Sequence, residues 1–468
     1  SYESNLPLFG TIYFPTAPEI RKWSINDSFK KGCDVMTMNR IQTDRQMKST
    51  VTVIILALCV VFSMLFSYVK DFPLKILLLC TTAVIMLILS FALLGWAVRN
   101  QIDRGLKYAW KHYVLVLRLR KELLDAGIYT TRKIGVEKVA VIPWITVNFE
   151  PDYKSGRVYI KNSIQFHEKL AKIDISSALG GYVVEQAYLT DNEEHYYYEF
   201  YDAHYDKRLI FDSYGEFQVY SDSVGDYDLF IDKDTALPLT HQLLVGQTGS
   251  GKSYALLGYI LQMLGKQIPY HLYFADPKES SIALLGERVS PDNTASDFEG
   301  IVSLLERFVS EMEERQAKIK EHLSQKIDGD YRDFGLSPHL LIFDEFSAFS
   351  QQLQEKDKKQ RDHVSSLLAQ IVLKGRQSDF FLWIVMQQSG SNSIPTFIRD
   401  NLPWKVVLGN AEEQTYVTAF GAGTDIPLRK LGVGEGVYTY PGVANKPKLC
   451  AFSTLDFGIL DALGARVM

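Results

Sequence analysis

Cysteine is scarce in this chain of 468 residues, which has four. The four are widely scattered and form no C-x-x-C pair, and two of them lie inside apolar runs. This pattern argues against a disulfide framework and against a zinc site, and it is typical of a protein kept in a reducing cytoplasm. An excess of positive charge is also lacking, because the formal net charge is −5. Any binding of nucleic acid would therefore depend on a local basic lining, not on the field of the whole chain.

The charge that is present is unevenly distributed. Residues 1–140 hold 19 Lys and Arg against 10 Asp and Glu, whereas residues 141–468 are net acidic. A basic front part followed by an acidic remainder indicates that the front part meets a membrane surface, including its lipid headgroups.

Two apolar runs without a formal charge, residues 51–69 and 76–98, lie close together near the start of the chain. Each is longer than the roughly 18 residues that a helix needs to cross a bilayer core. Buried core helices are the alternative, but two such runs in succession favour a transmembrane hairpin over residues 51–98. Basic residues flank the pair on both sides, so the positive-inside tendency predicts a multi-pass membrane protein with both termini in the cytoplasm.

The hairpin separates two further cytoplasmic segments. Residues 1–50 show no strong periodicity, and they receive no predicted fold. Residues 99–138 begin with apolar side chains at three- and four-residue steps, which predicts a basic juxtamembrane helix continuing the second span. Contact with headgroups explains its charges more simply than contact with nucleic acid.

Residues 139–235 are predicted to form a small α/β subdomain with helical spacing at 164–179. Its strands are expected at 139–149, 181–189, 196–203 and 208–220. Tyrosines cluster between Tyr196 and Tyr205, which is compatible with a stacking platform for single-stranded nucleic acid or with ordinary sheet packing. Because no Arg or Lys is interleaved with these tyrosines, sheet packing is the favoured interpretation.

The strongest motif follows an apolar strand candidate at residues 242–245 and opens a helix candidate at residues 253–264. It matches G-x-x-x-x-G-K-[ST] with the residues Gly246, Gln247, Thr248, Gly249, Ser250, Gly251, Lys252 and Ser253. The glycines let backbone N–H groups wrap the phosphates of ATP at a helix N-terminus. Lys252 is expected to reach the β- and γ-phosphates, and the Ser253 hydroxyl to ligate Mg²⁺. A chance match is disfavoured by the strand before the motif and the helix after it.

A P-loop predicts a later acidic strand, and residues 339–343 are an apolar strand followed by Asp344 and Glu345. We expect Asp344 to hold the magnesium shell and Glu345 to polarise the attacking water. Apolar strands that end in Asp are common, so this motif gains its meaning from its place after the P-loop.

A further strand candidate, residues 380–386, ends at Gln387. An amide at the carboxyl end of a central strand can sense the γ-phosphate or align water, because ligands of open α/β sheets bind at that edge. The alternative is a glutamine that faces solvent. Strands are also expected at 404–409 and 436–441, which together predict a RecA-like parallel sheet covered by helices.

The segments GQTGSGKS, FADPKES, EMEERQAK, LLIFDEF, LKGRQSDFFLWIVMQQ, IRDNLPWKVVLG and LGVGEGVY follow one another in this order. In order and spacing they resemble the FtsK/SpoIIIE family, whose members show a P-loop, D-P-K, M-x-x-R, an acidic strand, G-R, A-T-Q-R and a final G-x-G-[DE]. The resemblance covers residues 236–440 and implies an FtsK-like RecA-type ATPase motor over residues 236–468. Residues 166–185 also resemble the α/β subdomain that precedes this motor.

The sequence departs from the family pattern where an arginine is expected. The A-T-Q-R element retains Gln387 but has Gln388 in place of the arginine, and Lys405 stands at the basic position of N-x-P-x-R. Arg376 and Arg399 are therefore the candidates for an arginine finger supplied to a neighbouring subunit.

The resemblance implies a homohexameric ring in a bacterial cell membrane that pulls DNA through its pore by ATP hydrolysis. Two spans and no C-terminal winged-helix module make the chain similar to the coupling proteins of Gram-positive conjugative elements. Their partners are expected to be a relaxase or relaxosome and the proteins of a secretion channel. Three alternatives are a protein-export ATPase, a chromosome-segregation translocase and a scaffold that binds nucleotide without turnover.

Overall fold

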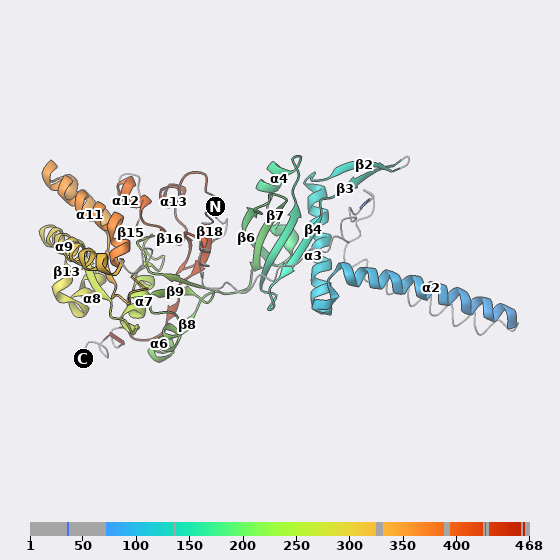
Figure 1. Ribbon diagram of the computed structural model, residues 1–468, viewed down its shortest axis with the longest axis horizontal. Helices are drawn as coiled ribbons and strands as arrows, with labels where there is room; N and C mark the ends of the chain where they lie inside the picture. Colours follow the sequence, from blue (N-terminus) through green and yellow to red (C-terminus); the bar gives the residue numbers. More distant parts are fainter. Residues whose placement is uncertain are drawn as a thin grey trace, which may run out of the picture. The chain divides into compact units, whose positions relative to one another are not determined.

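The computed structural model describes residues 35–36, 72–134, 137–323, 331–387, 394–424, 426, 430–459 and 462–463 (Figure 1). The chain forms two compact units, which are described separately here: Ser1–Gly180 with Ala187–Tyr198, and Gly181–Gln186 with Glu199–Met468. The first predicted membrane span, residues 51–69, lies outside the described residues, and so does all of the segment 1–50 except β1 (Val35–Met36).

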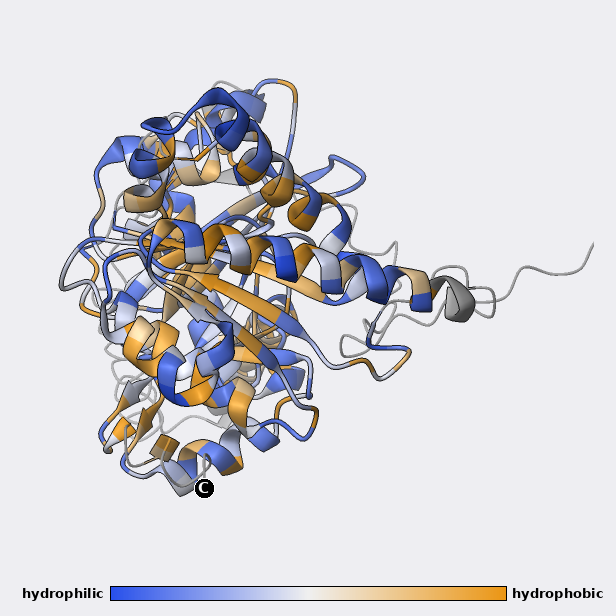
Figure 2. Cartoon of the chain, turned by 90° about the vertical axis from the view of Figure 1, so that its left-hand side faces the viewer, coloured by the Kyte–Doolittle hydropathy of each residue, from blue (hydrophilic) through white to orange (hydrophobic). Residues whose placement is uncertain are grey.

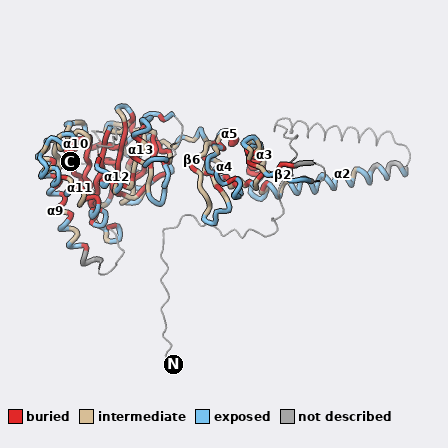
Figure 3. The backbone as a smooth tube through the Cα atoms, turned by 90° about the horizontal axis from the view of Figure 1, so that it is seen from above, coloured by how far each residue is buried: buried red, intermediate tan, exposed pale blue. Residues whose placement is uncertain are grey.

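The second predicted span forms helix α2 (Phe72–Arg99). Its portion Leu79–Arg99 has 21 residues, is long and apolar enough to cross a bilayer, and no residue of its most apolar stretch is buried. At 1.5 Å per residue this length corresponds to about 30 Å, the thickness of a hydrocarbon core. Figure 3 draws most of this helix as exposed. The helix is thus as predicted, whereas its pairing in a hairpin depends on residues that the structure does not describe.

The basic juxtamembrane helix predicted within residues 99–138 is present and ends at Asp125, but it does not continue the second span without a break. A short 3-10 helix, η2 (Ile102–Arg104), separates α2 from α3 (Leu106–Asp125). Gln101 and Gly105 have φ values of 56° and 105°, so the backbone leaves the right-handed helical region on both sides of η2. After α3 the chain forms the strands β2 (Thr130–Ile134) and β3 (Glu137–Val141), which pair antiparallel.

A four-stranded sheet in the order β4-β5-β7-β6 forms the body of the first unit. Its strands are β4 (Ile145–Phe149), β5 (Ser155–Lys161), β6 (Tyr182–Leu189) and β7 (His195–Asp202). The helix predicted over 164–179 is two short helices, α4 (His167–Lys172) and α5 (Ser176–Leu179). The break falls at Asp174, whose carboxylate accepts a hydrogen bond from the backbone N–H of Ser176 and so favours a turn.

The second unit contains, among its described residues, an eight-stranded sheet in the order β13-β12-β14-β15-β11-β16-β17-β18. Its strands are β11 (Gln242–Gly246), β12 (His271–Ala275), β13 (Thr294–Ala295), β14 (His339–Phe343), β15 (Phe380–Met386), β16 (Trp404–Leu408), β17 (Glu435–Tyr440) and β18 (Ala444–Ala451). The strands from β13 to β16 are parallel to their neighbours, whereas β17 and β18 pair antiparallel. The predicted α/β P-loop fold is therefore confirmed, with an antiparallel edge added.

Two hydrophobic cores lie on opposite faces of this sheet because successive strand residues point to opposite sides. Leu244 belongs to one core with α7 and α8, and Leu243 to the other with α9, α10 and α11. The helices are α7 (Lys252–Gly265), α8 (Ser281–Val289), α9 (Phe298–Leu323), α10 (Phe346–Gln354), α11 (Lys358–Ser378), α12 (Thr396–Asp400) and α13 (Glu413–Phe420), with η3 (Pro291–Asn293) after α8. Figure 2 shows the central strands mostly orange and the helices with blue and orange segments mixed, as amphipathic covering helices require.

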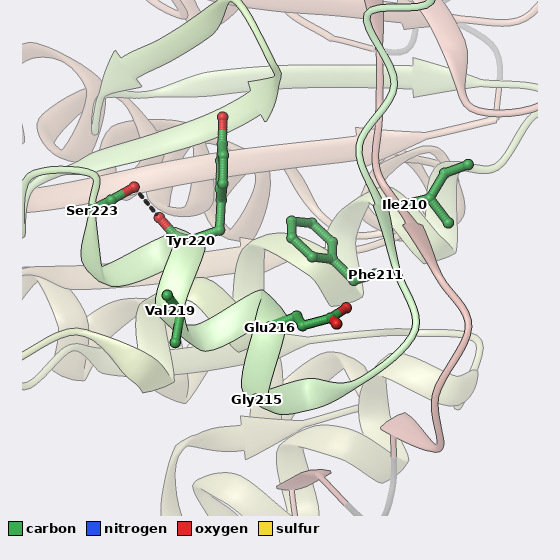
Figure 4. Close-up of a pocket in the computed structure, with 7 residues that line it drawn as sticks. All are labelled: Ile210, Phe211, Gly215, Glu216, Val219, Tyr220 and Ser223. Atoms are coloured by element: carbon green, nitrogen blue, oxygen red, sulfur yellow. Dashed lines mark hydrogen bonds between the residues drawn. The ribbon is translucent and has the colours of Figure 1, made fainter.

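The strand predicted over 208–220 is only partly correct. Residues Ile210–Phe211 form β8, but Tyr214–Asp222 form helix α6, which begins where the Ser213 side chain accepts a hydrogen bond from Glu216 N–H. An apolar pocket of about 600 Å³ lies between β8 and α6 (Figure 4), away from every site residue predicted from the sequence. The remaining strands are β9 (Asp228–Asp232), β10 (Thr235–Pro238) and β19 (Thr454–Leu455).

Candidate nucleotide-binding site

The predicted P-loop connects the end of β11 to the start of α7. Gly249 and Gly251 have φ values of 82° and 94°, which L-residues with a side chain rarely adopt. Gly251 caps α7, so Lys252 is the first residue of the helix and Ser253 the second. The loop therefore presents backbone N–H groups and a helix N-terminus at the carboxyl edge of the sheet, the arrangement that binds phosphates.

A second glycine-rich segment packs directly on the P-loop. The N–H of Gly434 donates a 2.8 Å hydrogen bond to Ser250 O. A Cβ atom on Gly251 would lie 2.8 Å from the backbone N of Gly434, so this close approach requires glycine at position 251. Gly434 belongs to the final G-x-G-[DE] motif, for which the sequence alone indicated no role. Through its hydrogen bond to Ser250, Gly434 holds the phosphate-binding loop in place.

Residues 431–435, which we name the glycine loop, are fixed at both ends. At one end the Asn410 side chain donates to Leu431 O at 2.8 Å and accepts from Leu431 N–H at 2.9 Å. In the middle, the Arg208 guanidinium donates to Val433 O. At the other end Gly434 O accepts a 2.8 Å hydrogen bond from the N–H of Phe452. The P-loop therefore packs on a segment that hydrogen bonds from three separate parts of the chain hold in place.

The two predicted carboxylates meet the P-loop lysine. Lys252 Nζ lies 3.8 Å from Asp344 Oδ1 and 3.8 Å from Glu345 Oε2. Both carboxylates follow β14, which lies two strands from β11 in the sheet, so the topology brings them to the same edge. Burial raises the pKa of Asp344, an effect that nearby Lys252 opposes. The three residues thus form one compact, largely desolvated cluster.

Glu345 is held in an unusual conformation. Its φ is 47°, which is uncommon for a residue with a side chain, and it precedes α10 as the N-cap residue. Its carboxylate accepts a 2.9 Å hydrogen bond from the Ser347 hydroxyl and lies 3.3 Å from Lys278 Nζ. The side chain is thereby directed toward Lys252 and not into solvent, as a water-orienting group requires.

Sequence reasoning missed the part played by Asp276, in the D-P-K motif after β12. Its fully buried carboxylate accepts hydrogen bonds from the N–H groups of Lys278 and Ser280. The Ser280 hydroxyl lies 2.6 Å from Asp276 Oδ2 and 3.4 Å from Asp344 Oδ2. Asp276 therefore shapes the turn that carries Lys278 to Glu345. An Asp two residues before a Lys and four before a Ser was the available signal.

The donor set fits a magnesium ion. Mg²⁺ prefers oxygen ligands and is held in nucleotide sites by one or two protein groups together with phosphate oxygens. Asp344 supplies a carboxylate, and the Ser253 hydroxyl is exposed in the first turn of α7. Lys252 offsets part of the negative charge of Asp344 and Glu345. A bound cation would offset that charge in its place, which would leave Lys252 to contact phosphates.

Gln387 follows β15 directly and is exposed. Because β15 is parallel to β11 and adjacent to it, Gln387 emerges at the same edge as the P-loop. This placement satisfies the topological requirement for a γ-phosphate sensor.

Arg376 lies at the opposite edge of the sheet. It is exposed in the last turn of α11, just before β15 begins at Phe380. Its neighbour His241 precedes β11, and burial together with the Arg376 charge lowers the pKa of His241 to about 3. Arg399 is half-buried in α12 and lies 3.4 Å from Asp400. Arg376 is therefore remote from the P-loop of its own subunit.

The comparisons with known proteins agree with this geometry. Residues 224–346, which include the P-loop, Asp276, Asp344 and Glu345, match the profile of the FtsK/SpoIIIE family. This part of the chain is an FtsK/SpoIIIE domain. The resemblance to this family is thus confirmed for residues 224–346, and the domain is an ATPase domain that contains the P-loop for ATP.

Two relatives are similar to part of this chain. The Ftsk domain-containing protein YdcQ of Bacillus subtilis (strain 168) is 32% identical over 198 residues, which make up 42% of this chain and 40% of that protein. The DNA translocase FtsK of Helicobacter pylori (strain J99) is 26% identical over 226 residues, covering 47% of this chain and 26% of that protein. The chain thus spans less than half of the length of either relative.

Two solved structures are also similar. The pCW3 conjugation coupling protein TcpA, a monomer form with ATPgS, has a TM-score of 0.46 and 14% identity over 75% of this chain and 98% of that one. EssC (ATPases 2 and 3) from Geobacillus thermodenitrificans has a TM-score of 0.42 and 16% identity over 56% of this chain and 51% of that one.

Proposed function

We propose that this protein is a membrane-anchored, ATP-driven DNA translocase that serves as a coupling protein and delivers DNA to a conjugative secretion channel. The observation that carries the proposal is the convergence of Lys252, Asp344 and Glu345 at the P-loop of an FtsK/SpoIIIE domain. A relaxase or relaxosome and the proteins of the channel are its proposed partners.

The geometry supports a separate role in ATP hydrolysis for each of these residues. Lys252 would neutralise charge on the β- and γ-phosphates. Ser253 and Asp344 would hold Mg²⁺, which would supply electrostatic stabilisation to the transferring phosphoryl group. Glu345 accepts a hydrogen bond from the attacking water and orients it. Lys278 and Ser347 keep the Glu345 carboxylate in position for that task. Gln387 contacts the γ-phosphate from the neighbouring strand end.

A ring of subunits accounts for the position of Arg376. The residue is exposed at the edge of the sheet opposite the P-loop, where a neighbouring copy can approach it. An arginine finger supplied by a neighbour stabilises charge on the phosphoryl group in many P-loop enzymes. We therefore propose a homo-oligomer, a hexamer in view of the family, in which Arg376 of one subunit completes the site of the next.

Membrane anchoring rests on α2 and on the residues that follow it. Trp96 near its end lies 6.4 Å from Trp110 and 5.8 Å from Tyr113, measured between ring centroids. Aromatic side chains gather at the level of the lipid headgroups, as do basic residues such as Arg99. The proposed location is a bacterial cell membrane, with α2 spanning it and the FtsK/SpoIIIE domain in the cytoplasm.

The proposal is tested by measuring ATP hydrolysis of the full chain in detergent micelles, with and without DNA. We expect DNA to stimulate the wild-type rate. Glu345→Gln keeps the size of the side chain but removes the group that orients water, so its turnover should fall about a hundredfold or more while ATP still binds. Glu287→Gln, an exposed glutamate on α8, is the matched control and should hydrolyse ATP normally.

Two results would contradict the proposal in different ways. Turnover by Glu345→Gln at the parent rate would show that Glu345 does not orient the water. A wild-type rate that is insensitive to DNA but stimulated by a secreted protein substrate would identify a protein-export ATPase instead.

A further inference from the structure

The two faces of the four-stranded sheet in the first unit differ in burial. Burial alternates along β5 and β7, so that Val158 and Tyr198 are buried while their neighbours are half-buried or exposed. The buried side packs on helices: the Tyr198 hydroxyl donates to Leu170 O of α4, and the Tyr108 hydroxyl of α3 donates to Val147 O of β4. The opposite side, which we name the aromatic face, carries Arg157, Tyr159, Lys161, Tyr188 and Tyr197.

Three tyrosines form a continuous row across this face. The ring centroids of Tyr159 and Tyr197 are 5.7 Å apart, with an angle of 32° between ring planes. Those of Tyr197 and Tyr188 are 5.4 Å apart, with an angle of 33°. The three residues come from β5, β7 and β6, which are neighbours in the sheet. Three strands thus contribute one ring each to a single aromatic surface.

Basic side chains accompany the rings. The Arg157 guanidinium lies 5.7 Å from the centre of the Tyr197 ring, and Lys161 is exposed on the same side of β5. Trp144, whose backbone O accepts a hydrogen bond from the N–H of Lys161, is exposed and packs edge-on against His195, with centroids 5.8 Å apart. The interleaved cations that the tyrosine-rich strand itself lacks are therefore supplied by its neighbour β5.

Acidic residues also surround the aromatic face, including Glu150 and Asp152 in the turn between β4 and β5. Asp191, Glu193 and Glu194 belong to the turn between β6 and β7. Glu199, two residues beyond Tyr197 on β7, is paired with Lys448 at 3.9 Å. Alternation along β7 places Glu199 on the same side as Tyr197, and Lys448 offsets its charge, so the rings remain accompanied by the positive charges of Arg157 and Lys161.

We propose that the aromatic face binds single-stranded DNA, with bases stacked on Tyr159, Tyr188 and Tyr197 and phosphates held by Arg157 and Lys161. Aromatic rings on an open sheet with basic groups beside them are the chemistry that recognises unpaired bases. A duplex keeps its bases stacked on one another and offers only phosphates to such a surface. The inference rests on the proposed function, since DNA is there the transported molecule, and it adds the site and the strandedness.

The test measures fluorescence anisotropy of labelled (dT)20 and of a 20-base-pair duplex with the full chain in detergent micelles. The double variant Tyr159→Ala/Tyr197→Ala should weaken binding of (dT)20 by about tenfold or more, because stacking on an aromatic side chain contributes strongly per base. Binding of the duplex should change much less. Tyr159→Phe/Tyr197→Phe retains both rings and should bind (dT)20 nearly as the parent does.

Two further variants separate stacking from other effects. Arg157→Ala should reduce the salt dependence of (dT)20 binding by about one phosphate contact. Tyr129→Ala, a half-buried tyrosine elsewhere in the first unit, is the matched control and should leave affinity unchanged. Unaltered ATP binding by all variants would show that the FtsK/SpoIIIE domain is intact.

The outcomes distinguish this inference from the function on which it rests. If the parent binds no DNA and DNA does not stimulate it, the translocase proposal fails. If the parent binds (dT)20 but the alanine double variant binds it equally well, the aromatic face is overturned and the translocase proposal stands. A change of oligomeric mass in that variant with full retention of (dT)20 binding would likewise overturn it, by assigning the face to subunit contact.

Discussion

Arg208 shows how a single side chain far from the P-loop in sequence acts on it. Its guanidinium donates to Val433 O, and the next residue, Gly434, donates its N–H to Ser250 O of the P-loop. Arg208 acts on the P-loop only through the glycine loop, so we interpret it as a positioning residue. Arg208 belongs to none of the motifs recognised in the sequence.

We expect Arg208→Ala to loosen the glycine loop and with it the P-loop. The apparent KM for ATP should rise about three- to tenfold, in line with loss of one charge-assisted hydrogen bond, while kcat changes little. Steady-state kinetics check this, and Arg208→Lys, which retains a donor, should recover part of the loss. Equal KM values for the parent and Arg208→Ala would show that the glycine loop does not need this support.

The candidate site was largely predictable at the residue scale because its chemistry is local in sequence. Lys252 and Ser253 follow from the P-loop pattern, and Asp344 and Glu345 from an apolar strand that ends in acids. The glycine loop was not predictable in the same way. Its contact with the P-loop joins residues about 180 positions apart, and the sequence of neither segment indicates which segment it contacts.

At the scale of elements, strands of the parallel sheet were predicted well and the segments around them less well. β11, β14 and β15 are buried throughout and consist mostly of apolar residues, because helices cover both faces of the sheet, and such runs are easy to recognise. α6 was mistaken for a strand because its aromatic residues also suit a sheet. The signal that decides it is the capping pattern Ser213-Tyr214-Gly215-Glu216, a Ser followed three residues later by Glu.

The cap of α6 can be tested directly. Ser213→Ala removes the acceptor of the Glu216 N–H and should lower the free energy of unfolding of the second unit by about 1 kcal/mol. Chemical denaturation followed by tryptophan fluorescence measures the change. Ser223→Ala, at the other end of α6, is the control and should have a smaller effect, because its hydroxyl only donates back to Tyr220 O. Equal stability of the parent and Ser213→Ala would show that packing alone holds α6.

The aromatic face illustrates what element-level prediction could not reach. The tyrosines of β7 were seen in the sequence, but their basic companions Arg157 and Lys161 lie about 40 residues earlier, on β5. Only the strand order β4-β5-β7-β6 places them together. Strand order depends on long-range pairing that short sequence patterns do not encode.

At the scale of the whole molecule, the question is whether one chain carries a complete catalytic site. We expect Arg376→Ala to lower ATP turnover about tenfold or more while leaving ATP binding intact, because its proposed target is the site of a neighbouring subunit. Mixing Arg376→Ala with Lys252→Ala should restore part of the activity, since some interfaces then combine an intact lysine with an intact arginine. Coupled-enzyme ATPase assays on the mixtures measure this.

The control for this experiment is Lys374, a basic residue that is exposed on the same helix, two positions before Arg376. Lys374→Ala removes a positive charge of the same helix end and should hydrolyse ATP at the parent rate. If the mixture of Arg376→Ala and Lys252→Ala stays inactive while each protein still assembles, Arg376 is not the finger, and Arg399→Ala should be mixed with Lys252→Ala in its place.

The P-loop and Arg376 lie on opposite edges of the sheet, and this separation also determines how many complete ATPase sites an assembly of subunits would contain. In the proposed oligomer, each subunit would supply Arg376 at one edge and receive a neighbour's arginine at the other, so contact between copies would be head-to-tail. An open row of such subunits always leaves one P-loop at its end without an arginine, whereas a closed ring leaves none. Closure therefore creates one more working site than the row had, from the same number of chains and the same residues. Assembly would then determine how many sites can hydrolyse ATP. The last subunit to join the ring would complete two sites, its own and that of a neighbour.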